Sequence, residues 1–321
     1  MRARLAAIAL ILSAGGVAAE TIPVSASAIS SFHKLSSSDD FGAFSFRGGL
    51  TLESDSEDFG GLSGLVLRDN CKDLLAVSDK GNWFSAKLAY DKGALSGISD
   101  GKLMPMLDSK GKRQRDKAWS DAEAIAPLNN GKIGIAYERR VRFGAYDIAK
   151  KGLSAPFEVI PHPPAIDRGP ENGEVEAFGQ LGDGRYIAIA ERQRDENGNP
   201  RAWIWRGNRA TSFTLERYDS YNVTDLAVMP DGTVLTMERS FTRTSLPGMA
   251  IRRFSPDDVK QGSLIKPELL LEASVPLYAI DNMEGIAVCV RDGEMRITLV
   301  SDNNFNTRIQ STVLLQFAYK P

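Results

Sequence analysis

The sequence has 321 residues, of which 42% are apolar and 25% charged, a composition typical of a soluble globular protein with a large core. Its 39 basic and 41 acidic residues give a net charge of −2. Because nucleic-acid binding needs a basic surface, this weak acidic balance argues against a nucleic-acid partner.

The chain begins with the features of a secretory signal peptide. Arg2 and Arg4 precede a short apolar stretch from Leu5, and small residues continue to Ala19. We therefore expect residues 1–19 to be cleaved after Ala19 and the protein to be periplasmic or secreted. An uncleaved membrane anchor is the alternative, but no apolar stretch here or later reaches the roughly 20 residues of a transmembrane helix. Cleavage changes the net charge to −4, from 37 basic against 41 acidic residues.

Cys71 and Cys289 are the two cysteines of the sequence. A disulfide between them would persist in an oxidising compartment. The sequence leaves open whether they pair or remain buried free thiols, because it does not show how far apart they lie.

Five segments of the chain share one pattern. Each begins with a polar or acidic residue, continues with a short apolar run and a turn rich in Asn, Asp and Gly, and ends with a second β-prone run and an acid. The segments are LSGLVLRDNCKDLLAVSDKG from Leu62, AEAIAPLNNGKIGIAYERR from Ala122, VEAFGQLGDGRYIAIAERQ from Val175, VTDLAVMPDGTVLTMERS from Val223 and MEGIAVCVRDGEMRITLVSDN from Met283. Asp-Gly or Asn-Gly between two β-prone runs is a strong hairpin signal.

The spacing of these segments predicts a β-propeller. Their leading residues are Ser63, Glu123, Glu176, Thr224 and Glu284, at intervals of 60, 53, 48 and 60 residues. Four-stranded propeller blades repeat every 40 to 50 residues or slightly more. A third β-prone run follows each hairpin, and helical periodicity is nearly absent, which disfavours an α/β fold. We predict an all-β fold, a single propeller of five four-stranded blades, with a degenerate sixth blade left open.

The two ends of the chain are expected to close the ring together. The last repeat leaves room for three strands, whereas the run FSFRGGLTLE within Phe41–Glu53 has no hairpin of its own. Pairing this N-terminal strand with the C-terminal blade would remove exposed sheet edges. The predicted organisation is a signal peptide at 1–19, an N-terminal lead-in at 20–40 and a propeller domain at 41–321.

One end of the central channel is predicted to be acidic. The first strand of each blade lines the channel, and the residue that begins it lies at the same end as the residue that ends the second strand. The leading residues should therefore meet a trailing set of acids, Asp79, Glu138, Glu191, Glu238 and Asp302. Arginines follow three of these acids, at Arg139, Arg192 and Arg239.

Converging carboxylates repel one another and require a cation, a proton or an arginine for compensation. We predict that Glu123, Glu176 and Glu284 hold Ca²⁺ or Mg²⁺, which prefer oxygen ligands. The three arginines would bind an anionic substrate group. The trailing acids are expected to be mainly structural, paired with their neighbouring arginines.

Other catalytic and cofactor sites lack their sequence signatures. Histidine occurs only at His33 and His162, which excludes metal sites built from several histidines. A G-x-S-x-G elbow, a P-loop and a G-x-G-x-x-G motif are all missing, so we expect no nucleotide or organic cofactor. Ser63 is interpreted as a blade-entry residue rather than a nucleophile.

Several motifs resemble those of the phytase-like family, labelled "esterase-like activity of phytase". They are FGGLSGLVL from Phe59, LLAVSDKGNWF from Leu74, EVEAF at Glu174, NMEGIAV at Asn282 and the closing TVLLQFAY. The resemblance covers essentially the whole mature chain and implies ester or phosphoester hydrolysis by an exported propeller, similar in plan to calcium-dependent lactonases and phytases. It places Ser63, Asp79, Glu123, Glu176 and Glu284 at the matching catalytic positions. The Arg-His-Gly motif of histidine-acid phytases is missing, so a phosphohistidine route is not available.

Two hypotheses of function remain open from the sequence. The first is a metal-assisted hydrolase of a small ester or phosphoester. The second is a non-catalytic periplasmic propeller that binds a protein or an envelope polymer through the same fold. The sequence does not predict the oligomeric state.

Overall fold

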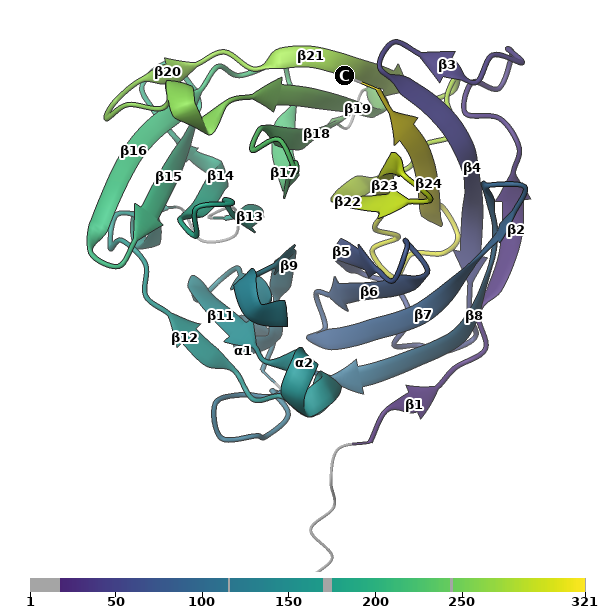
Figure 1. Cartoon of the computed structure of the whole chain (residues 1–321), viewed down its shortest axis with the longest axis horizontal. Helices are drawn as coiled ribbons and strands as arrows, with labels where there is room; N and C mark the ends of the chain where they lie inside the picture. Colours follow the sequence, from purple (N-terminus) through teal and green to yellow (C-terminus); the bar gives the residue numbers. More distant parts are fainter. Residues whose placement is uncertain (1–17, 115, 170–174, 243–244, 321) are drawn as a thin grey trace, which may run out of the picture.

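The computed structural model describes residues 18–114, 116–169, 175–242 and 245–320. Within them, five β-sheets stand around a central axis and form the blades of a propeller (Figure 1). The five-bladed prediction is therefore confirmed, and these residues form no sixth sheet. Residues 1–17 of the predicted signal peptide lie outside the described residues, so cleavage after Ala19 stays a prediction.

Each blade consists of four or five strands, numbered outward from the axis. Blade 1 contains β5 (Leu62–Arg68), β6 (Asp73–Ser78), β7 (Asn82–Asp91), β8 (Ala94–Pro105) and the short β1 (Glu20–Thr21). Blade 2 contains β9 (Ala122–Pro127), β10 (Ile133–Tyr137), β11 (Arg142–Tyr146) and β12 (Glu158–Ile160). Blade 3 contains β13 (Ala177–Gln180), β14 (Tyr186–Arg194), β15 (Pro200–Arg206), β16 (Arg209–Leu215) and β20 (Leu264–Ile265).

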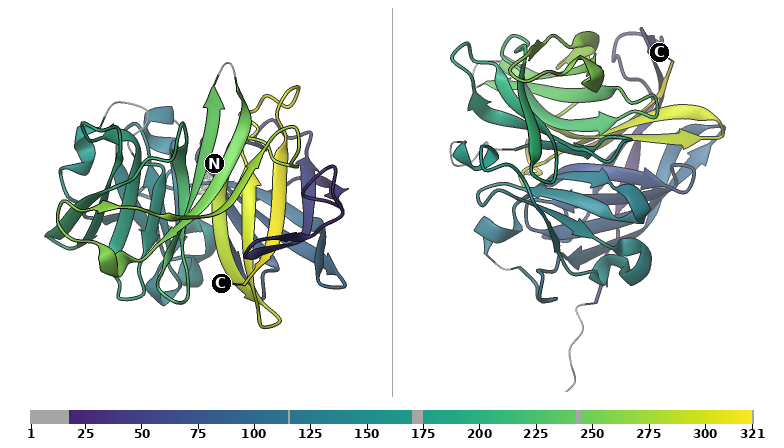
Figure 2. Two further views of the ribbon diagram at one scale, coloured as in Figure 1. Left: turned by 90° about the horizontal axis from the view of Figure 1, so that it is seen from above. Right: turned by 60° about the vertical axis from the view of Figure 1, so that its left-hand side comes forward.

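The remaining two blades differ in where their strands come from. Blade 4 is continuous, with β17 (Asn222–Val228), β18 (Val234–Thr242), β19 (Ser245–Phe254) and β21 (Glu268–Ser274). Blade 5 takes β22 (Met283–Arg291), β23 (Glu294–Ser301) and β24 (Thr312–Tyr319) from the C-terminus, and β4 (Phe44–Glu53) and β2 (Ser25–Ile29) from the N-terminus, with β3 (Asp40–Phe41) paired to β4. Figure 2 shows this ring in two further views, with the sheets side by side around the axis.

The ring closes as the sequence predicts. Strand β4 pairs antiparallel with β24, in a register that sets Leu50 opposite Leu314. Both leucines are fully buried, so the closure is sealed by apolar packing as well as by backbone hydrogen bonds. The segment 20–40, expected as a lead-in, adds β1 to the edge of blade 1 and β2 to the edge of blade 5.

The inner strands β5, β9, β13, β17 and β22 contact one another in sequence around the axis, and β22 contacts β5 to complete the circle. The Asp-Gly hairpin signal explains how each inner strand reverses into the next strand. At Asp292 and Gly293, which join β22 to β23, φ is 49° and 82°. A two-residue turn between twisted strands requires this left-handed backbone, which Gly adopts freely and Asp tolerates.

Cys71 and Cys289 form a disulfide, with their Cα atoms 5.8 Å apart and 218 residues between them in the sequence. It joins the β5–β6 turn of blade 1 to β22 of blade 5, at the junction where the ring closes. The question that the sequence left open is thereby resolved in favour of pairing, which is compatible with export to an oxidising compartment.

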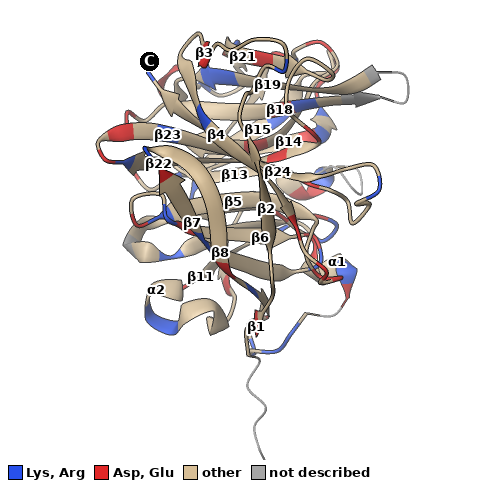
Figure 3. Ribbon diagram, turned by 90° about the vertical axis from the view of Figure 1, so that its right-hand side faces the viewer, with Lys and Arg blue, Asp and Glu red and all other residues tan. Residues whose placement is uncertain are grey.

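Helices are few and short in the described parts of the chain. They are α1 (Lys117–Ser120), α2 (Ile148–Lys151) and the 3₁₀ turns Asn129–Gly131, Gly152–Ser154, Ile166–Arg168 and Pro256–Asp258. Within the described ranges, no helix has the length and apolarity needed to cross a bilayer. Figure 3 shows acidic and basic residues interspersed over the ribbon, consistent with the small net charge.

Candidate functional site

All eight residues predicted for the site line one recess of about 260 Å³ at one end of the channel. They are Ser63, Asp79, Glu123, Arg139, Glu176, Arg192, Arg239 and Glu284. Lys117, Asp121, Glu138, Glu191, Asp302 and Asn304 complete the wall. The structure therefore brings together side chains from five separated repeats.

The leading residues reach this recess because the inner strands bulge where they begin. In blade 2, Ala122 and Ala124 pair with Tyr137 and Ala136, so that Glu123 is an extra residue between them. Register shifts at the same place leave Ser63, Thr224 and Glu284 without a cross-strand partner. A β-bulge redirects its extra side chain, and here it frees the leading residue from the ladder at the channel mouth.

Three carboxyls form the tightest group of oxygens in the recess. Asp121, Glu123 and Glu138 each offer an oxygen that lies within 4.8 Å of the other two. Asp121 is 2% exposed, and its Oδ1 accepts no hydrogen bond from the described residues. Its Oδ2 accepts a hydrogen bond from Arg139 Nε at 2.5 Å. An unsatisfied carboxylate oxygen in a cluster of oxygens suits a hard divalent cation.

The electrostatics of this group are unfavourable without a cation. Burial, and then the charges of Glu176 and Asp121, raise the pKa of Glu123 well above its ordinary value. Burial and the charges of Asp121 and Glu191 raise the pKa of Glu138 to about 7. Because a nearby cation favours the ionised form, metal binding would lower these pKa values again.

Arg239 neutralises the opposite side of the recess. Its Nη1 lies 2.6 Å from Glu284 Oε1, its Nη2 lies 3.9 Å from Glu191 Oε1, and it also donates a hydrogen bond to Asn282. Asn282 in turn donates to Glu284 Oε1 at 2.9 Å. Burial nevertheless raises the pKa of Glu284 to about 7, although Arg239 opposes the shift.

Glu176 differs from the other two leading glutamates. It does not belong to the tight oxygen group, and no ion pair or side-chain hydrogen bond joins it to another described residue. Burial, followed by the charges of Glu191 and Glu284, raises its pKa well above the ordinary value. Glu176 is therefore a carboxyl that can accept or release a proton near neutral pH.

Ser63 and Asp79 have local partners. The Ser63 hydroxyl donates to the backbone oxygen of Gly61 at 3.3 Å, and no histidine lines the recess. This arrangement fits a blade-entry residue better than an activated nucleophile. Asp79 Oδ2 lies 2.9 Å from Lys117 Nζ, and the same Nζ lies 3.7 Å from Asp121 Oδ1.

The three predicted substrate-binding arginines all contact carboxylates of the protein. Arg192 Nε lies 2.9 Å from Glu191 Oε2 and its side chain is 57% exposed, whereas Arg139 and Arg239 hold Asp121 and Glu284. Binding of an anionic substrate group by them stays a prediction.

Blade 4 departs from the other blades. Glu238 is 1% exposed and pairs with Arg252 at 2.7 Å inside the blade, rather than with the adjacent Arg239. Thr224 donates hydrogen bonds to backbone oxygens of Met237 and Met283. Neither residue lines the recess, so the structural interpretation of the trailing acids holds for Glu238, while Glu138, Glu191 and Asp302 face the channel.

Sequence analysis did not identify Asp121 or Lys117. A signal for Asp121 was present, because it precedes Glu123 by two residues, as Asn282 precedes Glu284. Lys117 lies on α1, outside the repeat, where no pattern predicts its contact with the recess.

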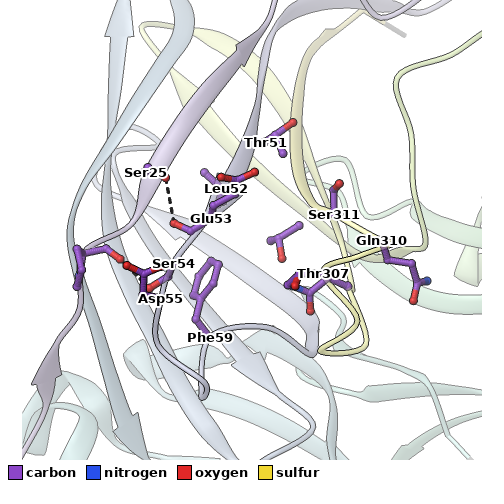
Figure 4. Close-up of a pocket in the computed structure, with 13 residues that line it drawn as sticks. Ser25, Thr51, Leu52, Glu53, Ser54, Asp55, Phe59, Thr307, Gln310 and Ser311 are labelled. Carbon is purple, nitrogen blue, oxygen red and sulfur yellow. Dashed lines mark hydrogen bonds between the residues drawn. The ribbon is translucent and has the colours of Figure 1, made fainter.

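A second polar cavity lies outside the channel, between the strands that close the ring (Figure 4). It is lined by Glu53 and Asp55, by hydroxyl groups such as Thr307 and by Gln310, and it contains no basic side chain. The segment after β23 links the two sites, because Asp302 lines the recess and Thr307 lines this cavity. Carboxyls with strongly shifted pKa values converge in the recess alone of these two, so the recess is the candidate site.

These features define an all-β propeller with a carboxylate-rich site on its axis. A family model described as "Esterase-like activity of phytase" matches residues 57–305, and the chain therefore belongs to the phytase-like family. None of the curated protein sequences matches the chain.

Solved structures with a similar fold include two gluconolactonases. One is a proposed gluconolactonase from a structural genomics consortium (10% identity, 94% of each chain covered, TM-score 0.45). The other is a gluconolactonase from Xanthomonas campestris (11% identity, 93% of this chain and 98% of that chain covered, TM-score 0.45). The Dos1 propeller is also similar (8% identity, 86% and 75% covered, TM-score 0.36). At these identities the likeness concerns the fold alone.

Proposed function

We propose that this protein is an exported hydrolase of an ester or phosphoester that works with a divalent cation, Ca²⁺ or Mg²⁺. The observation that carries the proposal is the charge of the recess. Eight carboxyls line it, against four basic side chains. Such an excess of buried negative charge needs protons or a cation to be stable.

Asp121, Glu123 and Glu138 are the residues that would hold the cation. They offer oxygen ligands only, and Asp121 Oδ1 lacks a hydrogen-bond donor among the described residues. A divalent cation at this place supplies a Lewis acid for a carbonyl or phosphoryl oxygen. This assignment keeps Glu123 as a predicted ligand and gives Glu176 and Glu284 other roles.

Glu176 would act as the proton acceptor for the attacking water. It lies in the same recess, makes no ion pair with the described residues, and its raised pKa suits proton transfer near neutral pH. Arg239 would keep Glu284 and Glu191 in place and limit the negative charge next to Glu176. Lys117 and Arg192, which are more than half exposed, lie where they could meet an anionic part of the substrate.

The experiment that tests this function combines metal content with activity. The purified protein should contain Ca²⁺ or Mg²⁺, and chelation should lower its thermal midpoint because the cation binds only the folded state. It should hydrolyse members of a panel of p-nitrophenyl esters and phosphates. Glu176→Gln should lower kcat by about 100-fold, the loss expected for a general base, without changing the metal content.

Glu196→Gln is the matched control, since Glu196 is an exposed glutamate in the turn after β14. This variant should keep full activity. Asp121→Asn should remove the stabilisation by metal while the apo protein still folds. A metal-free protein that is inert toward every ester and phosphate would contradict the proposal and favour the non-catalytic binding propeller.

A further inference from the structure

The channel end opposite the recess is apolar. A cavity of about 260 Å³ lies there, and the ends of all five inner strands contribute to its wall. Its deepest layer is a ring of large side chains, each 0–3% exposed: Leu65, Ile125, Phe178, Leu226 and Ile286. Apolar cavities hold water poorly and accept apolar ligands.

The repeat itself builds this ring. Each member lies two residues after a leading residue, as Ile125 follows Glu123 and Ile286 follows Glu284. Because the side chains of a strand alternate and the inner strands run the same way along the axis, the five apolar positions form one layer. The same register therefore produces an acidic end and an apolar end.

The two ends are separate sites. The apolar cavity and the recess share no lining residue. Between them lies Asp225, which is fully buried and accepts hydrogen bonds from the backbone nitrogens of Leu226 and Ile286, both at 2.8 Å. These bonds join β17 to β22 across the level that divides the channel.

Arg68 is the one charged residue in the wall of the apolar cavity. It is exposed at the end of β5, and its guanidinium makes no hydrogen bond or ion pair with another described residue. A guanidinium beside an apolar cavity suits a ligand with an apolar body and an anionic end, because arginine pairs well with carboxylates.

From this arrangement we infer that the cavity binds an apolar chain that ends in a carboxylate, such as a medium-chain fatty acid. The chain lies against the apolar ring, and the carboxylate pairs with Arg68. This site is independent of hydrolysis in the recess.

Isothermal titration of the purified protein with decanoate and with decanol tests the inference. Decanoate should bind saturably at one site per chain. Arg68→Glu should weaken decanoate binding by about tenfold, roughly the loss of one charge-assisted contact, and leave decanol binding unchanged. The control is Arg209→Glu, the same charge reversal on an exposed arginine of β16 outside the cavity, and it should bind both ligands normally.

A second variant tests the apolar body of the site. Gly182 belongs to the cavity wall, and a Cβ added there meets no heavy atom within 4 Å, so Gly182→Trp can fold and narrow the opening. It should weaken decanoate and decanol alike, whereas Gly182→Ala should not. The inference is overturned if decanoate does not bind saturably, if Arg68→Glu leaves its affinity unchanged, or if Gly182→Trp affects neither ligand.

Discussion

Reduction of the disulfide should lower the stability of the propeller markedly. Cys71 and Cys289 are 218 residues apart, so the bridge closes a loop that spans most of the chain. The chain-entropy relation gives about 5 kcal/mol for a loop of this length, and measured losses on removal of native disulfides are typically 2–5 kcal/mol. At roughly 2 °C per kcal/mol for a chain of this size, the thermal midpoint should fall by about 4–10 °C.

The assay is thermal unfolding followed by circular dichroism, with and without a thiol reductant. Reduction keeps the sulfur atoms in place, which matters because Cys71 is fully buried and replacing it by alanine would also leave a cavity. The double variant Cys71→Ala/Cys289→Ala controls for other effects of the reductant and should not respond to it. If the wild-type protein melts at the same temperature in both states, the reasoning about ring closure is refuted.

Two further predictions concern buried charge. Glu238→Ala should lower the free energy of unfolding, measured in urea, by about 3–5 kcal/mol, because it leaves Arg252 charged and unpaired inside blade 4; Glu238→Leu/Arg252→Met should cost much less, and an equal loss would contradict this cause. In the metal-free protein, burial raises the pKa of Glu284 to about 7 and that of Asp302 to about 6, so the folded state keeps protons that the unfolded state releases. Stability in the presence of a chelator should therefore fall as the pH rises from about 4 to 7, by about 3 kcal/mol for a carboxyl shifted as far as Glu284; a midpoint that rises over this range would contradict it.

The fold could be predicted from the sequence because its information is local and repeated. The turn at Asp292-Gly293 and the apolar runs on either side define a hairpin without reference to distant residues. The closure by Phe44–Glu53 followed from counting strands, since a blade with three strands lacks one. The disulfide could not be predicted in this way, because it depends on how closely blades 1 and 5 approach each other.

The site could be predicted only as a set of positions. The repeat register indicated that Glu123, Glu176 and Glu284 share one end of the channel, and all three line the recess. The register did not indicate their different partners. Arg239 follows Glu238 in the sequence but pairs with Glu284 of the next blade, because Glu238 points into blade 4 toward Arg252. Such choices depend on packing between blades, which a single repeat does not contain.

The divergence of the five repeats at their leading position gives the recess its asymmetry. A ring of five glutamates would be uniformly repulsive, whereas Ser63 and Thr224 occupy two of the positions and bind backbone oxygens instead. The remaining acids then divide into an oxygen group at Asp121, Glu123 and Glu138 and a neutralised pair at Glu284 and Arg239. Glu176 lies in the same recess without belonging to either. This separation of roles is what a propeller needs to convert a symmetric channel into a site with one cation position and one proton acceptor.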